Sequence, residues 1–416
     1  MAITLPRPGS QMPDSGLPPA HSRPSSSPAD SHARTREPGS LNGAEIHQAQ
    51  EVPASEKNHP SSEFGTAQQE MIKILRRSQE RGASDVIISV GLPPMFRVSG
   101  TLVRDNFPVL NPDMTKKLVY ALLRQDQIGE FEAKMELDLS ITIPKVARFR
   151  VNVYRQKKFV GAAFRSITED IPGFKDLGLS KAVETLALLP RGLVLITGPT
   201  GSGKSSTLAA MVDLINERTS GHIITIEDPI EYVHKHKNCI VDQRELKTDT
   251  ESFPTALRHV LRQDPDTILV GEMRDLETIS SAISAAETGH LVLSTLHTQD
   301  SAQTVDRIID AFPAYAQEQI RAQLSTTLRG IISQQLLPRK TGGRVAAREI
   351  LLVTPAIANL IREGKTYQIH SAIQTGQKLG MITLDQHLNE LYQKGLITYE
   401  DAVSKAVYPE NIKPDF

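Results

Sequence analysis

The chain has 416 residues, of which 39% are hydrophobic, and 47 basic side chains nearly balance 48 acidic ones. That length gives room for about two or three domains, and the balanced charge excludes an excess of positive charge for non-specific nucleic-acid binding. A single cysteine, Cys239, excludes an intrachain disulfide and a four-cysteine zinc module. No apolar run approaches the roughly 20 residues needed to cross a bilayer, and no secretory signal opens the chain, so we expect a cytosolic protein.

Residues 1–62 differ in composition from the rest of the chain. They hold 10 of the 26 prolines, 11 serines and no aromatic residue. Such a segment cannot bury enough apolar surface to offset the entropy that is lost on ordering. We therefore expect a disordered, proline-rich tail.

Residues 63–168 predict a small α+β domain. Apolar residues recur at helical spacing, and β-branched runs alternate with glycine and proline turns. The expected elements are helices over 66–80 and 112–136, two strands between 83 and 104, and strands over 137–143, 147–155 and 159–167.

After a linker at 169–180, residues 181–408 change to an α/β pattern, in which short apolar runs alternate with long helical stretches. This alternation predicts a mostly parallel sheet with helices on both faces. From about residue 313 we expect a mainly helical part, and then a short tail at 409–416. The expected strands are 193–197, 222–226, 267–270 and 291–295.

Residues 198–205 read GPTGSGKS and match the phosphate-binding pattern G-x-x-x-x-G-K-[ST] in full. An apolar strand precedes the loop and a helix follows it, so that backbone N–H groups and the helix N-terminus can meet phosphate oxygens. Lys204 would reach the β- and γ-phosphates, and the Ser205 hydroxyl would ligate Mg2+. The predicted nucleotide-binding residues are Gly198, Pro199, Thr200, Gly201, Ser202, Gly203, Lys204, Ser205 and Ser206.

Acidic residues follow two of the predicted strands. Glu227, Asp228 and Glu231 come after one strand, and Glu272 comes after another. In an open parallel sheet, ligands bind beyond the carboxyl ends of the strands, so both groups point toward the phosphate-binding loop. A carboxylate there can hold Mg2+ or orient the attacking water. For Glu227 and Asp228, an ordinary solvated loop acid is an equally open alternative.

Two histidines, His290 and His297, flank the strand predicted over 291–295. At about 3.3 Å per residue they lie over about 20 Å apart and cannot share a metal ion unless the strand ends before His297. A polar sensor near the γ-phosphate suits His297, and a purely structural histidine suits it as well.

Four motifs together carry a family resemblance: GPTGSGKS at 198–205, ITIEDPIEYVH at 224–234, ILVGEMRDLETI at 268–279 and TGHLVLSTLHT at 288–298. From about residue 66 to 400 the chain resembles the secretion-superfamily motor ATPases, most closely the twitching-motility (PilT-type) ATPases of type IV pili. The resemblance implies a PAS-like N-terminal domain followed by a RecA-like P-loop ATPase domain.

The resemblance also implies roles for particular residues. Glu231 takes the place of the catalytic base, Glu272 that of the Walker B acid beside Mg2+, and Lys204 completes the catalytic set. Glu227 and Asp228 belong to the family's aspartate box, and His290 and His297 to its histidine box. Further arginines implied in nucleotide sensing or in contacts between domains are Arg258, Arg262, Arg148, Arg150 and Arg165.

As a function, the resemblance implies a homohexameric, Mg2+-dependent ATP hydrolase that drives pilus retraction from the cytoplasmic face of the inner membrane. Its partners would be the inner-membrane platform protein and the pilus machinery, with no nucleic acid and no membrane insertion. Ala358 and Ile87 stand where retraction ATPases carry an arginine and a histidine. An accessory (PilU-like) motor, or an assembly or type II secretion ATPase, is therefore the alternative. Outside the family, a RecA-like helicase and a nucleotide-gated regulator are the rivals.

Overall fold

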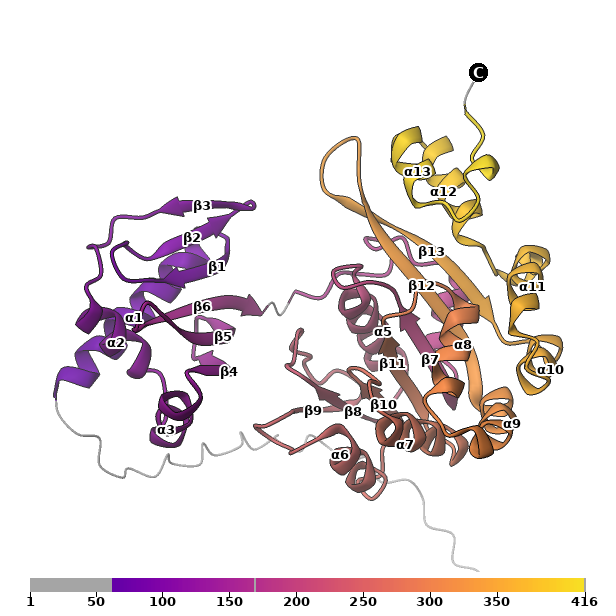
Figure 1. Cartoon of the computed structure of the whole chain (residues 1–416), viewed down its shortest axis with the longest axis horizontal. Coiled ribbons are helices and arrows are strands. Elements are labelled where there is room, and N and C mark those ends of the chain that lie inside the picture. The colour runs from indigo at the N-terminus through magenta and orange to yellow at the C-terminus, as the bar shows by residue number, and fades with distance from the viewer. Residues whose placement is uncertain (1–61, 168–169, 415–416) are drawn as a thin grey trace, which may run out of the picture. The chain divides into compact units, whose positions relative to one another are not determined.

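The computed structural model describes residues 62–167 and 170–414, so the predicted tail of residues 1–62 lies almost wholly outside the described residues. The described chain forms two sheets, one from the residues before 168 and one from the residues after it (Figure 1). Within the described residues, no helix has the length and the apolar stretch that a membrane span requires.

The first sheet has six strands in the order β3-β2-β1-β6-β5-β4, and all neighbours run antiparallel. Three helices complete this part, and their apolar faces share a core with the sheet that includes Met71, Phe96, Phe131, Phe149 and Phe164. The strands are β1 (Ala83–Ile88), β2 (Met95–Val98), β3 (Thr101–Arg104), β4 (Glu136–Ile143), β5 (Ala147–Gln156) and β6 (Phe159–Ile167), and the helices are α1 (Ser62–Glu80), α2 (Pro112–Tyr120) and α3 (Gln125–Lys134).

The single helix predicted over 112–136 is wrong, because α2 and α3 are separate helices. Arg124 adopts an extended backbone conformation and forms the N-cap of α3, where its N–H donates to the side chain of Gln127 at 3.0 Å. Helical periodicity alone does not reveal such a break, since apolar residues continue through it.

The second sheet has seven strands in the order β13-β12-β7-β11-β10-β8-β9. Only the β12–β13 pair is antiparallel, which confirms the predicted, mostly parallel sheet. The strands are β7 (Gly192–Thr197), β8 (His222–Glu227), β9 (Ile240–Glu245), β10 (Thr267–Val270), β11 (Leu291–Leu296), β12 (Leu328–Pro338) and β13 (Arg344–Leu352). The helices are α4 (Lys181–Ala187), α5 (Lys204–Arg218), α6 (Phe253–Val260), α7 (Leu276–Glu287), α8 (Ser301–Asp310), α9 (Gln317–Thr327), α10 (Pro355–Arg362), α11 (Ile369–Thr375), α12 (Leu384–Gln393) and α13 (Tyr399–Lys405).

Alternating residues of β7 show why helices cover both faces of this sheet. Leu193 and Leu195 pack in one core with α6, α7 and α8, whereas Val194 and Ile196 pack in another with α4 and α5. Because successive side chains of a strand point to opposite faces, a strand buried on both sides reads as a continuous apolar run. The four predicted strands of this sheet are confirmed for that reason.

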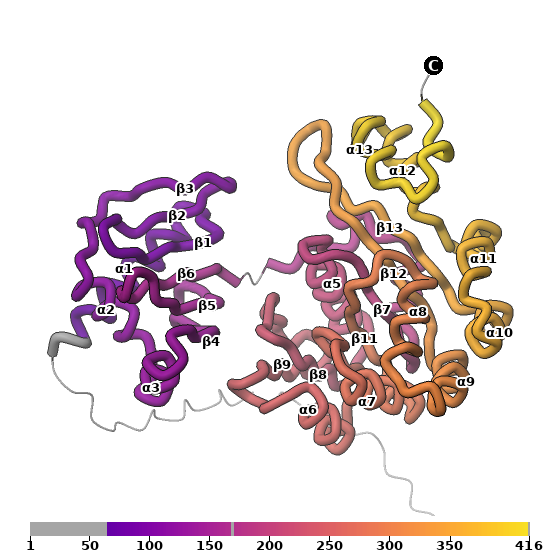
Figure 2. Tube along the Cα trace, in the orientation of Figure 1, coloured from indigo at the N-terminus to yellow at the C-terminus, as the bar shows by residue number. Residues whose placement is uncertain are grey.

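The prediction of a mainly helical chain from about residue 313 is wrong over β12 and β13. Strand β13, RVAAREILL, is rich in residues with high helix propensity. Its pairing along the full length of β12, and that of β12 with β7, override this local preference. The hairpin joining β12 to β13 extends toward α12 and α13 (Figure 2), and the predicted helical part is therefore divided into α9 before the hairpin and α10 to α13 after it.

Candidate functional site

The phosphate-binding loop joins β7, every residue of which is buried, to α5. Gly198 has φ +136°, and a Cβ there would lie 2.2 Å from the carbonyl oxygen of Gln334 on β12. Gly203 has φ +88° and forms the N-cap of α5 without a side chain. Glycine is needed at both positions because L residues rarely adopt these conformations. These conformations let the loop turn tightly, as backbone N–H groups that surround phosphate oxygens require.

Lys204 is the first residue of α5, and its Nζ donates to the carbonyl oxygens of Gly198 (2.8 Å) and Pro199 (3.1 Å). Burial lowers the pKa of Lys204, and the negative charges of Glu272 and Glu231 oppose that shift. Both carboxylates thus act on the lysine ammonium. The structure brings together three of the predicted site residues from three different parts of the chain.

Glu272 follows the buried strand β10, and its carboxylate is only 19% exposed. One carboxylate oxygen lies 3.0 Å from Nε2 of His297, and the other lies 2.8 Å from the guanidinium of Arg274. This pairing raises the pKa of Arg274. His297 directly follows β11, so it connects the end of one strand to the acid at the end of its neighbour.

Glu227 is the last residue of β8, and Asp228 and Glu231 belong to the turn that follows it. The Asp228–Pro229 peptide bond is cis, and the side chains of Asp228 and Glu231 are exposed. Glu227 points inward instead. Its carboxylate accepts from the Thr225 hydroxyl (2.7 Å) and, at 3.4 Å, from the backbone N–H of Glu231. Within this acidic cluster, only Glu231 and Asp228 face solvent where a ligand can reach them.

Although Glu227 as a residue is only half-buried, burial of its carboxyl group raises the pKa to about 7. Between about pH 4.5 and pH 7 the folded protein then holds a proton that the unfolded chain has released, so this group's contribution to stability falls as pH rises. We expect the free energy of unfolding of the wild type, taken relative to that of Glu227→Gln, to fall by about 1–3 kcal/mol from pH 5 to pH 8. Denaturant unfolding at several pH values measures it.

The exposed Glu251→Gln is the matched control for this experiment, and its difference from the wild type should stay within about 0.5 kcal/mol over the same range. Parallel stability curves for the wild type and Glu227→Gln would show that the Glu227 carboxyl is not buried in solution.

His290 and His297 lie at opposite ends of β11, as the sequence predicted, because β11 occupies the residues between them. His290 contacts the carbonyl oxygen of Ala285 (2.9 Å) and the hydroxyl of Thr288 (3.2 Å) near the amino end of the strand. It therefore lies away from the phosphate-binding loop, which follows the carboxyl end of the neighbouring β7.

The predicted arginines occupy two regions. Arg258 on α6 lies 3.2 Å from Glu277 of α7, and Arg262 donates to the carbonyl oxygen of Arg258 at 3.3 Å. Arg150 on β5 pairs in register with Arg165 on β6, and Arg165 also bonds Asp85 at 2.8 Å. Arg148, two residues earlier on β5, donates to the Ser140 hydroxyl at 2.8 Å.

Three residues near the site escaped the sequence analysis. The Tyr232 hydroxyl lies 2.7 Å from that of Ser206 on α5. Gln334 of β12 donates to the Ser202 carbonyl at 2.9 Å and accepts from Thr207 at 3.0 Å. Gln243 of β9 bonds the turn after β8. No motif marks the two glutamines, because both lie on strands that the sequence pattern did not reveal.

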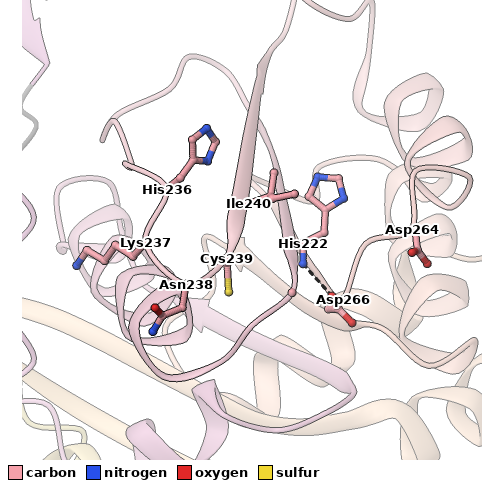
Figure 3. A pocket seen from close by; sticks show the side chains of 9 residues that line it. His222, His236, Lys237, Asn238, Cys239, Ile240, Asp264 and Asp266 are labelled. Atoms are coloured by element: carbon pink, nitrogen blue, oxygen red, sulfur yellow. Dashed lines mark hydrogen bonds between the residues drawn. The ribbon is translucent and has the colours of Figure 1, made fainter. Parts of the chain in front are cut away.

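A separate hollow of about 640 Å³ lies near the amino ends of β8 and β9 and is lined by His222, His236, Cys239 and Asp266 among others (Figure 3). Its wall is held together by a hydrogen bond from the His222 N–H to Asp266 at 2.8 Å. In a parallel sheet, ligands bind at the carboxyl ends of the strands. This hollow is at the wrong end of the sheet to take part in chemistry at the phosphate-binding loop.

Oxygen donors near the loop suit a hard cation. The hydroxyl of Ser205 in the first turn of α5 and the carboxylate of Glu272 at the end of β10 are the ligand types that Mg2+ prefers. The residues present therefore fit the predicted magnesium site, with Glu272 already oriented by His297 and Arg274.

A parallel sheet, a glycine-rich loop running into a helix and acids at the neighbouring strand ends define a RecA-like P-loop nucleotide-binding protein. The family described as Type II/IV secretion system protein matches residues 170–402, more than half of the chain. The chain therefore belongs to this family.

Individual relatives match almost the whole described region. The type IV pilus retraction ATPase PilT of Pseudomonas aeruginosa is 52% identical over 82% of this chain and 99% of its own length. The type IV pilus ATPase PilU of the same organism is 43% identical over 81% of this chain and 88% of its own length. A crystal structure of the pilus retraction motor PilT with bound ADP is similar at 50% identity and a TM-score of 0.77, covering 82% of this chain and 97% of that one.

Proposed function

We propose that this chain is a Mg2+-dependent ATP hydrolase that acts as a homohexamer and drives retraction of a type IV pilus. One observation carries the proposal. The negative charges of Glu231 and Glu272 both act on the Lys204 ammonium, which is bonded to carbonyl oxygens of the phosphate-binding loop, in a chain that is 52% identical to a pilus retraction ATPase. The platform protein of the inner membrane and the pilus base are the expected partners at the cytoplasmic face of that membrane.

The residues divide the chemistry among them. The backbone N–H groups of residues 198–206 and the Lys204 ammonium bind and neutralise the β- and γ-phosphates. Glu231 accepts the proton of the water that attacks the γ-phosphorus, the bond from that phosphorus to the β,γ-bridging oxygen breaks, and ADP and inorganic phosphate are the products. Mg2+ supplies further charge neutralisation when bound, and Ser205 and Glu272 would hold it. His297 responds to this site through its contact with Glu272.

In this proposal, arginines couple ATP hydrolysis to the movement of domains or subunits. Arg148, Arg150 and Arg165 of the first sheet, and Arg258 and Arg262 at α6, are cations that can add to the nucleotide site when domains or subunits close. Closure and reopening with each turnover would turn hydrolysis into displacement of partner subunits.

The test combines ATP turnover with particle mass on the purified full-length chain, with and without DNA. We expect Mg2+-dependent hydrolysis by a hexamer and no stimulation by DNA. Stimulation by DNA would favour a helicase, and stoichiometric ATP binding without turnover would favour a regulator. Loss of twitching in a deletion strain, with pili still present, would establish retraction, whereas loss of the pili themselves would indicate an assembly motor.

An accessory retraction motor is the second candidate, since Ala358 on α10 replaces the family's arginine. The higher identity to PilT than to PilU favours the principal motor. Restoring twitching in a strain that lacks its own retraction ATPase, without any other motor, distinguishes the two.

A further inference from the structure

The segment that carries Glu231 runs between β8 and β9, and the residues 228–234 are here called the acidic loop. Glu231 itself is exposed, so packing does little to hold its side chain in one place. A general base must lie within hydrogen-bond reach of the water it activates, and an error of about 1 Å costs about 100-fold in rate. Something other than Glu231 must therefore fix the loop.

Gln243 is the residue best placed to do so. It lies in the middle of β9, directly opposite Thr225 of β8 in the parallel register. Its Nε2 donates to the carbonyl oxygen of Tyr232 at 2.9 Å and to the Glu227 carboxylate at 3.3 Å. Its Oε1 accepts from the backbone N–H of His234 at 2.7 Å. A single side chain thus bonds the carboxyl-terminal part of the acidic loop, at Tyr232 and His234, and also Glu227, the residue directly before the loop.

The other contacts of the acidic loop show how much depends on this side chain. Before Glu231, the Ile230 N–H donates to Glu245 at 3.2 Å, and the Glu231 N–H meets Glu227 at a longer 3.4 Å. Immediately after Glu231, the Tyr232 carbonyl is held by Gln243. Because Gln243 also bonds Glu227, it links the two groups that bracket the Glu231 backbone. Loss of its amide would remove the bond to the Tyr232 backbone and leave on this side the hydrogen bond between the hydroxyls of Tyr232 and Ser206.

We propose that Gln243 is a positioning residue for the hydrolysis of the γ-phosphate, fixing the backbone on which the Glu231 carboxylate is presented to the attacking water. This inference rests on the proposed function of Glu231 as the base. Gln243 touches neither phosphate nor water in this assignment and acts only through Glu231. The edge strand β9 thereby contributes to catalysis without carrying a catalytic residue.

Two variants test the assignment. Gln243→Leu keeps the approximate size and removes all three hydrogen bonds. Gln243→Glu keeps the acceptor for the His234 N–H but replaces the donor to the Tyr232 carbonyl with a second acceptor. For both we expect kcat to fall about 10–100-fold, with KM for ATP and the affinity for ADP changed less than about 3-fold. Gln323→Leu replaces a half-buried glutamine of α9 whose side chain bonds only Glu287 among the described hydrogen bonds; it is the matched control and should keep the wild-type kcat.

A partly unfolded sample also lowers kcat without changing KM, so the decisive comparison is made in the background of Glu231→Gln. In that background the carboxylate that Gln243 would position is absent. Adding Gln243→Leu or Gln243→Glu should therefore change the remaining rate less than about 2-fold. A further 10–100-fold loss in the double variants would overturn the proposal in favour of a structural role. Calorimetry measures how many ADP molecules bind per protein chain, and it checks that the same fraction of each sample is competent to bind.

The outcomes separate this proposal from the proposed function. If Glu231→Gln abolishes turnover while both Gln243 variants keep the wild-type kcat, the positioning role is wrong and the base assignment stands. If Glu231→Gln itself keeps the wild-type kcat, the base assignment is wrong, and the positioning role fails with it.

Discussion

Replacing Lys204 with alanine should lower ATP turnover at least about 100-fold, because the ammonium nearest to the transferred phosphate is lost. In this structure Lys204 is the residue on which the loop carbonyls of Gly198 and Pro199 and the charges of Glu231 and Glu272 all converge. Steady-state hydrolysis with saturating Mg2+ measures the effect, together with ADP affinity.

The fold should survive this substitution, since the Lys204 side chain is only half-buried and is not part of an apolar core, and one of the two removed bonds goes to the exposed Pro199. We expect a melting temperature within a few degrees of the wild type, and the same value for Lys181→Ala, whose side chain is 80% exposed. Lys181→Ala should also hydrolyse ATP normally. Normal turnover by Lys204→Ala would exclude the phosphate-binding assignment of the loop.

The second large effect on hydrolysis is expected for Glu231→Gln. The amide preserves size but loses basicity, and hydrolysis should fall by about 10²–10⁴-fold, the usual contribution of a general base. ATP binding should remain, because Glu231 is exposed and does not build the phosphate-binding loop. The variant is thus expected to retain ATP after a single-turnover experiment in which the wild type releases ADP.

Glu272→Gln provides the contrast. Its carboxylate is bound by Arg274 and His297 and lies where Mg2+ is expected, so neutralising it should weaken the Mg2+ dependence of ATP binding as well as turnover. Titrating Mg2+ at fixed ATP separates the two acids. Normal hydrolysis by Glu231→Gln, combined with tight Mg2+–ATP binding and no turnover by Glu272→Gln, would mean that the two roles are exchanged.

The phosphate-binding loop could be predicted from the sequence because its chemistry is local. Glycines at positions that require positive φ, a lysine and a serine are consecutive in the chain, between an apolar run and a helical one. The strands β7, β8, β10 and β11 could be predicted for a related reason, since burial on both faces produces a short, uninterrupted apolar segment. The placement of Glu272 at a strand end followed from the same pattern.

Only the tertiary structure revealed the strands whose stability comes from their neighbours. Edge strand β9, IVDQRE, has few apolar residues, and β13 has a composition that favours helix, so neither has a local signal. Gln334 and Gln243 lie on such strands, and they reach the phosphate-binding loop and the acidic loop only because the sheet aligns them. The residues that carry the chemistry were thus readable from the sequence, whereas those that hold them in place depend on contacts between distant segments.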